Sequence, residues 1–440
     1  MKVSLAKGTQ DFLPQSAVPR QKVMGRLAQV FEKYGFEPLE TPAFEKIETL
    51  TGKYGDEGEK LIFKILKRGE DGKSGEADLA LRYDLTVPLA RVVAMYGELP
   101  RPFKRYQMAP VWRAERPQRG RFREFYQCDV DVAGSTSSLV EVELLSMAVE
   151  TYTALGFTDF TVWLNHRQVL RGLIHAAGIP EAREVEALVT LDKLDKIGAD
   201  GVSKELLERG FTHEQLQPLQ TLMGLSGDNM TLLEQLSTLV GEHEGAKAGL
   251  GNLGEILRGL EQAGIPAGRV KISPVLARGL SYYTGAIYEV QVEGFSSSIG
   301  AGGRYDNLVG LFSSRTVPAC GFSFGLDRIL MLLEERKLLS LESCRTQVLV
   351  PLASEEVKGA CLKLASELRA AGVRVDVYPE LQKLGTQLQY GTQRGIPWAV
   401  IQTGEELGKG GVNVRNLKTR AQTFVPREEV VTHLVGLLTP

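Results

Sequence analysis

The strongest constraint on the fold comes from two strand-like segments that a short polar loop separates. The segments are RYQMAPVWRAE, residues 105–115, and RFREFYQCDVDVAG, residues 121–134, and the loop between them is RPQRG. A connection this short cannot carry a parallel crossover, because parallel strands need a dozen or more connecting residues. The two segments are therefore expected to pair as antiparallel strands.

The sequence around this hairpin indicates further strands interrupted by helices. Apolar spacing predicts helices over residues 20–36, 86–96 and 138–155, and strands over residues 60–66, 77–85 and 157–165. Residues at about 170–265 are Leu-, Glu- and Gly-rich helical sequence, after which strand-like sequence resumes. The chain is therefore expected to have an α/β (α+β) fold, with an antiparallel sheet and this helical insertion in a domain of residues 1–335.

A second domain is expected at the C-terminal end. Residues 346–440 alternate strand and helix, beginning with QVLVPL, and the charged residues 336–345 before them are typical of a linker. A chain of 440 residues is long enough for two to three domains. We therefore expect a compact mixed α/β domain of its own over residues 346–440.

Composition limits the partners and the compartment. The 52 basic and 54 acidic residues give a net charge of −2, so any contact with RNA has to come from local patches. The N-terminal sequence has no signal-peptide pattern, and no run of eighteen apolar residues occurs, so we expect a cytoplasmic protein without a membrane span. The four cysteines lie far apart and lack the spacing of zinc ligands, so we expect reduced, structural thiols.

One face of the second hairpin strand has the side chains of a binding surface. Residues two apart on a strand share a face, so one side is expected to present Arg121, Arg123, Phe125, Gln127, Asp129 and Asp131. Guanidinium groups suit phosphate oxygens, an aromatic ring suits a stacked base, and an amide with carboxylates suits an ammonium or an imidazole. A solvated strand face with incidental charge is the alternative, and six such residues in register favour the binding surface.

Several motifs resemble the histidyl-tRNA synthetase family of class II aminoacyl-tRNA synthetases. VWRAE with RFREFYQCDVDV is similar to the second class II motif, and CGFSFGLDRILML is similar to the third. LARGLSYYTGAIYEV and GAGGRYDNLVG resemble two segments peculiar to the histidyl family, and KGTQDFLP and RYDLTVPLAR agree with them. Ser281 stands where Asp is the commoner residue. The resemblance implies a class II catalytic domain followed by an anticodon-binding domain.

The resemblance also implies an activity and a set of site residues. It implies a histidine–tRNA ligase that activates histidine with ATP and Mg²⁺, without naming the magnesium ligands, and transfers it to the 3′ end of tRNA(His). Arg113 and Arg278 would be catalytic at the α-phosphate. Histidine would be bound by Asp84, Thr86, Gln127, Asp131, Tyr282, Tyr283 and Tyr305. ATP would be bound by Arg113, Glu115, Arg121, Phe125 and Arg328, and the tRNA acceptor end by Arg116, Gln118 and Arg119. The family also implies a homodimer that pairs around residues 34–45.

Alternatives remain for one residue and for the whole chain. Asp84 precedes a predicted helix and would also suit a helix cap, a role that is compatible with substrate binding. A non-catalytic regulatory subunit of ATP phosphoribosyltransferase would share the fold but usually lacks the terminal domain and the arginines. A synthetase-like module that senses uncharged tRNA would sit in a longer chain with a kinase. A synthetase for proline, threonine or glycine is the third alternative.

Overall fold

The computed structural model describes residues 3–277, 282–338 and 344–438, and the chain divides into two compact units. The first unit comprises residues 1–10 and 23–339, and the second comprises residues 11–22 and 340–440. Each unit has a hydrophobic core of its own.

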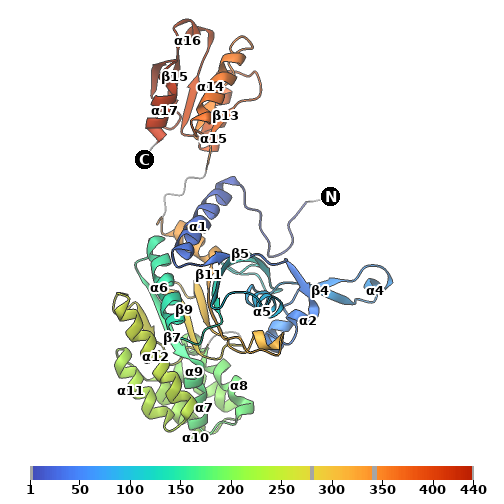
Figure 1. Cartoon of the computed structure of the whole chain (residues 1–440), viewed down its shortest axis with the longest axis vertical. Coiled ribbons are helices and arrows are strands. Elements are labelled where there is room, and N and C mark those ends of the chain that lie inside the picture. Colours follow the sequence, from blue (N-terminus) through green and yellow to red (C-terminus); the bar gives the residue numbers. More distant parts are fainter. Residues whose placement is uncertain (1–2, 278–281, 339–343, 439–440) are drawn as a thin grey trace. The chain divides into compact units, whose positions relative to one another are not determined.

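An eight-stranded sheet forms the centre of the described part of the first unit (Figure 1). The predicted hairpin is confirmed: its two strands pair antiparallel from Phe103↔Ala133 to Trp112↔Glu124. The short edge strands β1 (Glu37–Pro38) and β8 (Val270–Ile272) pair in parallel with β5 (Phe103–Trp112) and β7 (Phe160–His166), and the other neighbours are antiparallel. In spatial order the strands are β1 (Glu37–Pro38), β5 (Phe103–Trp112), β6 (Glu124–Ala133), β11 (Ala319–Gly325), β10 (Gly300–Arg304), β9 (Ala286–Val292), β7 (Phe160–His166) and β8 (Val270–Ile272).

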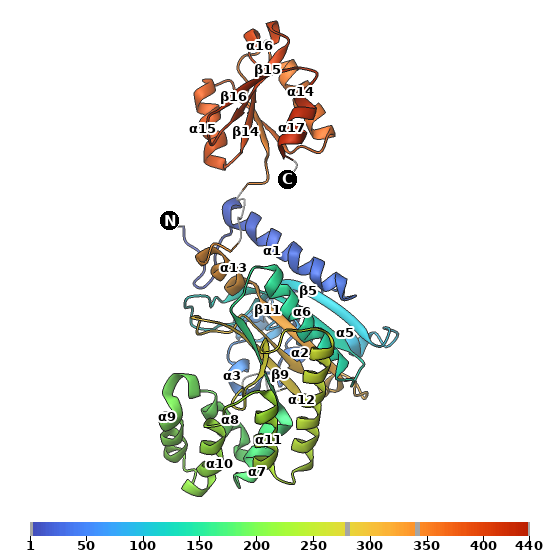
Figure 2. The same ribbon diagram turned by 90° about the vertical axis from the view of Figure 1, so that its left-hand side faces the viewer.

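Helices cover one face of this sheet, as Figures 1 and 2 show. They are residues 23–33 of α1 (Pro14–Lys33), α6 (Leu139–Ala154), α12 (Glu244–Gln262) and α13 (Leu326–Glu335). The helix α6 packs against both β11 and α12, which explains why it is apolar around most of its circumference. The helix α1 begins at Pro14, earlier than the predicted residue 20, and a proline suits the first turn because its missing N–H would have no intrahelical partner there.

A smaller three-stranded sheet and α5 (Thr86–Met95) build a second core in this unit. The sheet has the order β2 (Phe44–Lys46), β4 (Ala77–Leu81), β3 (Lys64–Leu66), with the short helices α2 (Ile47–Leu50), α3 (Gly55–Glu59) and α4 (Glu70–Lys73) beside it in the chain. Val87 and Leu89 of α5 belong to a core cluster that also contains Tyr305, which brings α5 close to the end of β10.

The predicted helical insertion is confirmed, and it lies between β7 and β8. Its helices are α7 (Arg167–Ala176), η1 (Glu181–Arg183), α8 (Glu184–Leu191), α9 (Leu194–Glu208), α10 (His213–Met223), α11 (Asn229–Val240) and α12. Polar caps define two of the starts: Thr212 and Gln215 form a capping box before α10, and Asp228 accepts from the Thr231 N–H before α11. A short 3-10 helix, η2 (Val309–Leu311), follows β10.

The second unit has the expected mixed α/β architecture. Its sheet has the order β13 (Val375–Val377), β12 (Val348–Val350), β14 (Trp398–Ile401), β15 (Gly411–Asn416), β16 (Gln422–Pro426). The pairs of β12 with β13 and β14 are parallel, and the remaining pairs are antiparallel. The sheet is accompanied by α14 (Lys358–Ala370), α15 (Leu384–Arg394), α16 (Gly404–Gly408) and α17 (Val430–Leu438).

Candidate active site

The candidate site begins on the face of β6 that points away from the main core. Cys128, Val130 and Val132 belong to that core. Since side chains alternate along a strand, Gln127, Asp129 and Asp131 point to the opposite face. Asp129 and Asp131 are only 2% and 3% exposed, which is unusual for carboxylates and requires polar partners.

Asp131 obtains its partners from three neighbouring segments. Arg105 lies opposite it on β5, and the guanidinium Nη2 is 2.8 Å from Asp131 Oδ2. The hydroxyl of Tyr305, just after β10, donates to Asp131 Oδ1. Gly321 pairs with Asp131 from β11, and a Cβ there would stand 1.9 Å from Oδ1, so a side chain at this position would displace the carboxylate. Asp131 is therefore held by Arg105 and Tyr305, and Gly321 leaves the space that its carboxylate occupies.

Asp84 reaches the same region from the start of α5. Its Oδ1 accepts from the Tyr54 hydroxyl at 3.1 Å and from the Val87 N–H at 3.0 Å, and its Oδ2 accepts from Tyr282 at 3.4 Å. Burial raises the pKa of Asp84, while the Val87 hydrogen bond and the charge of Arg113 oppose the rise. The Val87 contact is a helix-capping interaction, so the capping role proposed as an alternative is present alongside the contacts to the tyrosines.

Three tyrosine rings gather between the two carboxylates. The Tyr282 ring lies 5.1 Å from that of Tyr283 and 5.8 Å from that of Tyr305, and Tyr282 also contacts Thr86. Burial, followed by the negative charge of Asp131, raises the pKa of Tyr283, so this phenol remains a proton donor at neutral pH. Gly303 faces Tyr283, where a Cβ would come within 2.8 Å of the ring.

Several buried polar atoms here have no hydrogen-bond partner within the described ranges. They are Gln107 Oε1, Gln127 Oε1, Asp129 Oδ1, Asp131 Oδ2, whose contact with Arg105 is an ion pair only, and, on Arg105, Nε and Nη1. Buried polar atoms are normally satisfied in proteins, so such a cluster is typical of a ligand site. Sequence reasoning had assigned no site role to Arg105, Gln107 or Tyr54. Arg105 and Gln107 could have been identified from the alternation of side chains along β5 together with the β5–β6 register, because they lie opposite Asp131 and Asp129.

The predicted ATP-binding side chains also come together, although not on one strand face. The Arg113 guanidinium lies 5.1 Å from the centre of the Phe125 ring, and Arg121 forms an ion pair with Glu115. Burial lowers the pKa of Arg328, and the positive charge of Arg121 lowers it further, so these cations are close neighbours.

The expectation that Arg121 and Arg123 belong to the same strand as Asp131 was wrong. The strand β6 begins only at Glu124. Before it the chain turns back on itself, because the backbones of Gln118 and Arg121 hydrogen-bond to each other at 3.1 and 2.9 Å. The arginine end of the motif is therefore carried by a turn and not by the sheet.

The predicted tRNA-binding residues lie in this exposed turn. Arg116, Gln118 and Arg119 are all exposed, and Arg119 forms an ion pair with Glu335 at the end of α13. Arg278, predicted to be catalytic, and Ser281 lie outside the described residues.

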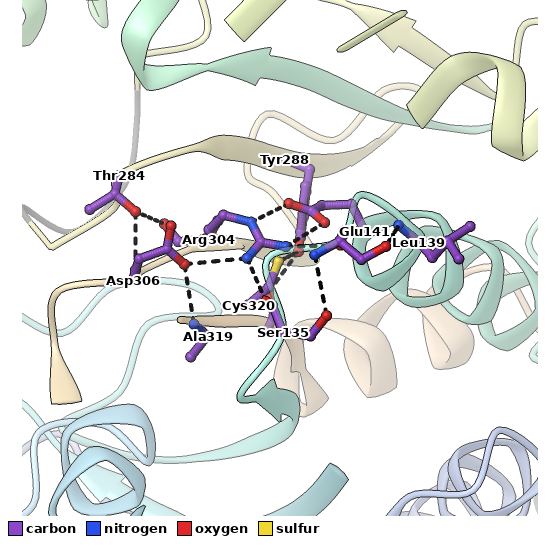
Figure 3. A network of polar contacts seen from close by, with 11 residues as sticks. Ser135, Leu139, Glu141, Thr284, Tyr288, Arg304, Asp306, Ala319 and Cys320 are labelled. Atoms are coloured by element: carbon purple, nitrogen blue, oxygen red, sulfur yellow. Dashed lines mark hydrogen bonds and ion pairs between the residues drawn. The ribbon is translucent and has the colours of Figure 1, made fainter. Parts of the chain in front are cut away.

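A buried ion pair supports the tyrosine side of the site (Figure 3). Arg304 Nε and Nη2 donate to the two carboxylate oxygens of Glu141 at 2.6 and 2.7 Å. Nη1 donates to the Ser135 carbonyl at 2.9 Å and to Asp306 at 3.3 Å, and Nη2 also donates to the Ser137 carbonyl at 3.2 Å. Every N–H of this guanidinium therefore has an acceptor, which joins the end of β10 to α6 and to the turn before it.

The same network holds the backbone beside two of the tyrosines. The Asp306 N–H donates to Thr284 Oγ1 at 3.0 Å, and the Thr284 N–H donates to the Arg304 carbonyl at 2.8 Å (Figure 3). Thr284 follows Tyr283, and Arg304 precedes Tyr305. The ion pair therefore positions both rings against Asp131 without touching it.

The described residues form neither a candidate metal centre nor a membrane-spanning helix. Within residues 3–277, 282–338 and 344–438, no group of three or more His, Cys, Asp or Glu side chains could hold a metal ion. No helix in the part of the chain that the structure describes is long and apolar enough to span a bilayer. All four cysteines are thiols; three of them are buried and Cys344 is half-buried.

Comparisons with known proteins cover nearly the whole chain. The family model described as Histidyl-tRNA synthetase matches residues 8–329, and the one described as Anticodon binding domain matches residues 347–437. The histidine–tRNA ligase of Gloeobacter violaceus is 46% identical, with 95% of each chain covered. The crystal structure of histidyl-tRNA synthetase from Nostoc sp. PCC 7120 is similar with a TM-score of 0.87 and 32% identity, and both chains are covered completely.

A more distant structure shares the fold alone. It is described as an ATP phosphoribosyltransferase regulatory subunit/histidyl-tRNA synthetase from Bacillus halodurans, with a TM-score of 0.76 and 22% identity. It covers 92% of the present chain and is itself covered completely.

Proposed function

The chain belongs to the histidyl-tRNA synthetase family and is a histidine–tRNA ligase, and we propose that the pocket formed by β6, the start of α5 and Tyr305 binds its histidine. The observation that carries this proposal is the pair of buried acceptors, Gln127 Oε1 and Asp129 Oδ1, which lack a partner among the described residues. Buried acceptors without donors are costly, and the ammonium and ring N–H groups of histidine are donors that would satisfy them.

Each histidine-binding residue has a distinct role in this proposal. Asp84 and Gln127 accept from the α-ammonium group, and Thr86 stands at the rim of that subsite. Asp131 accepts from the imidazole ring, and Tyr283 supplies a hydroxyl on the other side of the ring. Tyr305 and Tyr282 orient Asp131 and Asp84, to which their hydroxyl groups donate. A side chain without ring nitrogens would leave these groups unpaired, which can discriminate by about 10⁴-fold or more.

The arginines are assigned to ATP. In the first step a carboxylate oxygen of histidine attacks the α-phosphorus and pyrophosphate leaves, and Arg113 with Arg278 neutralises the charge that develops. Arg121 and Arg328 meet the distal phosphates. The adenine ring stacks on Phe125, and its amino group donates to Glu115.

Magnesium enters as the counter-ion of the ATP phosphates, whose charge it neutralises. Among the described residues no group of three or more His, Cys, Asp or Glu side chains could hold the ion, so no step is assigned to it.

Transfer to tRNA uses two parts of the chain in this proposal. The exposed turn with Arg116, Gln118 and Arg119 contacts the acceptor end of the tRNA. The second part is residues 346–440, an anticodon-binding domain. A linker of residues 336–345 joins it to the catalytic domain of residues 1–335. Gln118→Ala is expected to slow transfer to tRNA but not pyrophosphate exchange. Equal losses in both steps would argue against the turn as a tRNA contact.

The assembly and the compartment are also proposals. We infer a homodimer that pairs around residues 34–45, as family resemblance implies, and a cytoplasmic location, where the tRNA substrate of translation is found. Sedimentation at micromolar concentration tests the first, and fractionation of cells tests the second.

Histidine-dependent exchange of pyrophosphate into ATP tests the pocket directly. The wild-type chain should catalyse exchange with histidine and not with proline, threonine or glycine. Asp84→Asn and Asp131→Asn should each raise the KM for histidine by about 100-fold or more, since each loses a charge-assisted hydrogen bond and leaves its partners unpaired. Unchanged KM values in both variants would overturn the assignment of the pocket.

The regulatory-subunit alternative is less well supported. A structure whose description includes that function is similar with 22% sequence identity, and this level of identity supports a shared fold only. The terminal domain and Arg113, Arg121 and Arg328 are all present here, whereas such subunits were expected to lack them. Absence of any amino-acid-dependent exchange would favour this alternative.

A further inference from the structure

Asp129 is a buried carboxylate of the pocket, and its Oδ1 is one of the two acceptors that histidine would satisfy. It lies between Gln127 and Asp131 on the same face of β6 and is 2% exposed. Ser323, its cross-strand partner on β11, is hydrogen-bonded to it and also accepts from Gln127 Nε2 at 3.0 Å. Its Oδ1 has no partner in the described part of the chain. One oxygen of Asp129 is thus anchored and the other is available to a donor.

The charged and titratable groups around Asp129 leave it without a cation of its own. From β5 it meets Arg105, from β6 Asp131, from the start of α5 Asp84, and from the segment before β9 Tyr283. The Nη2 of Arg105 is committed to Asp131 at 2.8 Å and to the Leu85 carbonyl. Asp129 and Asp131 therefore share the buried Arg105 guanidinium, whereas the cation that acts on Asp84 is Arg113.

This imbalance affects the protonation of Asp129. Burial raises the pKa of Asp129 to about 7; Arg105 opposes the rise and the adjacent Asp131 adds to it. Above neutral pH the carboxylate is ionised, acceptor-only and short of positive charge. A bound cation that donates a hydrogen bond would relieve both deficits.

The substrate ring can supply that cation. On the proposed function, on which this inference rests, the imidazole reaches Asp131, and Gly303 and Gly321 leave the space beside it without side chains. The ring of histidine titrates near pH ~6.5, and only its protonated form has two N–H donors. Asp131 and Asp129 offer one acceptor for each.

We propose that the pocket binds histidine with its ring as the imidazolium ion, one N–H donating to Asp131 and the other to Asp129 Oδ1, which takes the place assigned above to the Tyr283 hydroxyl. When binding occurs above neutral pH, one proton passes from solvent to the second ring nitrogen, and no other bond is made or broken. Asp129 is then a specificity residue, because it selects substrates for the basicity of their ring as well as for its shape.

Calorimetry of histidine binding to the full chain at pH 8, in phosphate and in Tris, measures the proton uptake. The wild-type protein should take up about one proton per histidine, because free histidine is mostly unprotonated on the ring at that pH. The isosteric variant Asp129→Asn should take up close to none. Since the α-amino group contributes equally to both proteins, the difference between them is the decisive quantity. Equal uptake by the two proteins would overturn the proposal.

A second measurement needs no variant. The affinity of the wild-type protein for histidine should fall about tenfold per pH unit above pH ~7.5, because one proton is taken up on binding. Triazolylalanine, which has the same shape but a ring that is not basic, should bind with little pH dependence, so the preference for histidine shrinks as the pH rises. A constant preference would contradict the proposal.

The two levels of inference fail differently. Normal histidine-dependent pyrophosphate exchange with no proton uptake would overturn only the imidazolium proposal. Lack of histidine binding and of exchange in the wild-type chain would overturn the proposed function itself.

Discussion

Arg105 on β5 and Asp131 on β6 lie directly opposite each other, with Nη2 2.8 Å from Oδ2 and both side chains almost completely buried. The same Nη2 donates to the Leu85 carbonyl at 3.1 Å, so Arg105 also joins the sheet to the start of α5. Breaking an ion pair at this depth is costly, because the surviving charge keeps no counter-ion.

Arg105→Met is expected to lower the free energy of unfolding by about 3–5 kcal/mol, because it keeps most of the side-chain volume but leaves the buried Asp131 carboxylate without its counter-ion. Urea unfolding followed by circular dichroism measures the change. Arg105→Lys keeps the charge and should lose clearly less. Similar losses in the two variants would show that the shape of the guanidinium, and not its charge, matters.

Gly321→Ala is expected to impair histidine binding, because the added Cβ would stand 1.9 Å from Asp131 Oδ1 and has to displace it. We expect the KM for histidine in pyrophosphate exchange to rise by about 10-fold or more, the equivalent of losing one hydrogen bond to a charged group. Gly359→Ala, in α14, is the matched control, since a Cβ there meets nothing within 4 Å. An unchanged KM in the Gly321 variant would contradict the geometry.

Glu141→Gln should destabilise the first unit by about 3–5 kcal/mol, because it removes the bidentate counter-ion of the buried Arg304 guanidinium and leaves it with Asp306, 3.3 Å from Nη1. The control is Glu355→Gln, whose ion pair with Lys358 is exposed, and it should cost under about 1 kcal/mol. Chemical unfolding of the two variants gives the comparison. If both variants lower the free energy of unfolding by similarly small amounts, the network of Figure 3 does not position Tyr283 and Tyr305.

Asp129→Asn is expected to stabilise the protein near pH 8 and to do so much less near pH 4. The pKa of Asp129 is raised from 3.8 to about 7 in the folded protein. Between those two values the unfolded chain releases the proton while the folded chain keeps it, so this group lowers stability as the pH rises through that window. Asparagine removes the penalty. Melting temperatures at the two pH values test this, and an equal difference at both would refute it.

Arg278 remains a prediction from family resemblance, because it lies outside the described residues. Arg278→Ala should fold normally and bind histidine within a few-fold, while pyrophosphate exchange falls by about 10²–10³-fold through loss of one preorganised donor. Arg278→Lys should recover only part, because an ammonium cannot make the bidentate contact. Near-normal exchange by the alanine variant would end the assignment.

Much of the architecture follows from local features of the sequence. The five-residue loop between the hairpin segments permits only an antiparallel pair, and the alternation along residues 127–131 separates a core face from a polar face. The motifs also indicated the family and most of the side chains that meet in the pocket. These are short-range properties, determined by steric limits and by periodicity.

The tertiary structure decided which of those polar side chains face one another. The sequence placed Arg121 and Arg123 in the same strand as Asp131, but the chain turns back at Gln118 and the strand starts only at Glu124. The pairing of Arg105 with Asp131 depends on β-sheet register, and the contact of Asp84 with Tyr282 joins residues 198 positions apart. The burial that raises the pKa of Asp129 exists only when α5, β11 and the tyrosines close over β6, because desolvation is a property of the packed site and not of any segment.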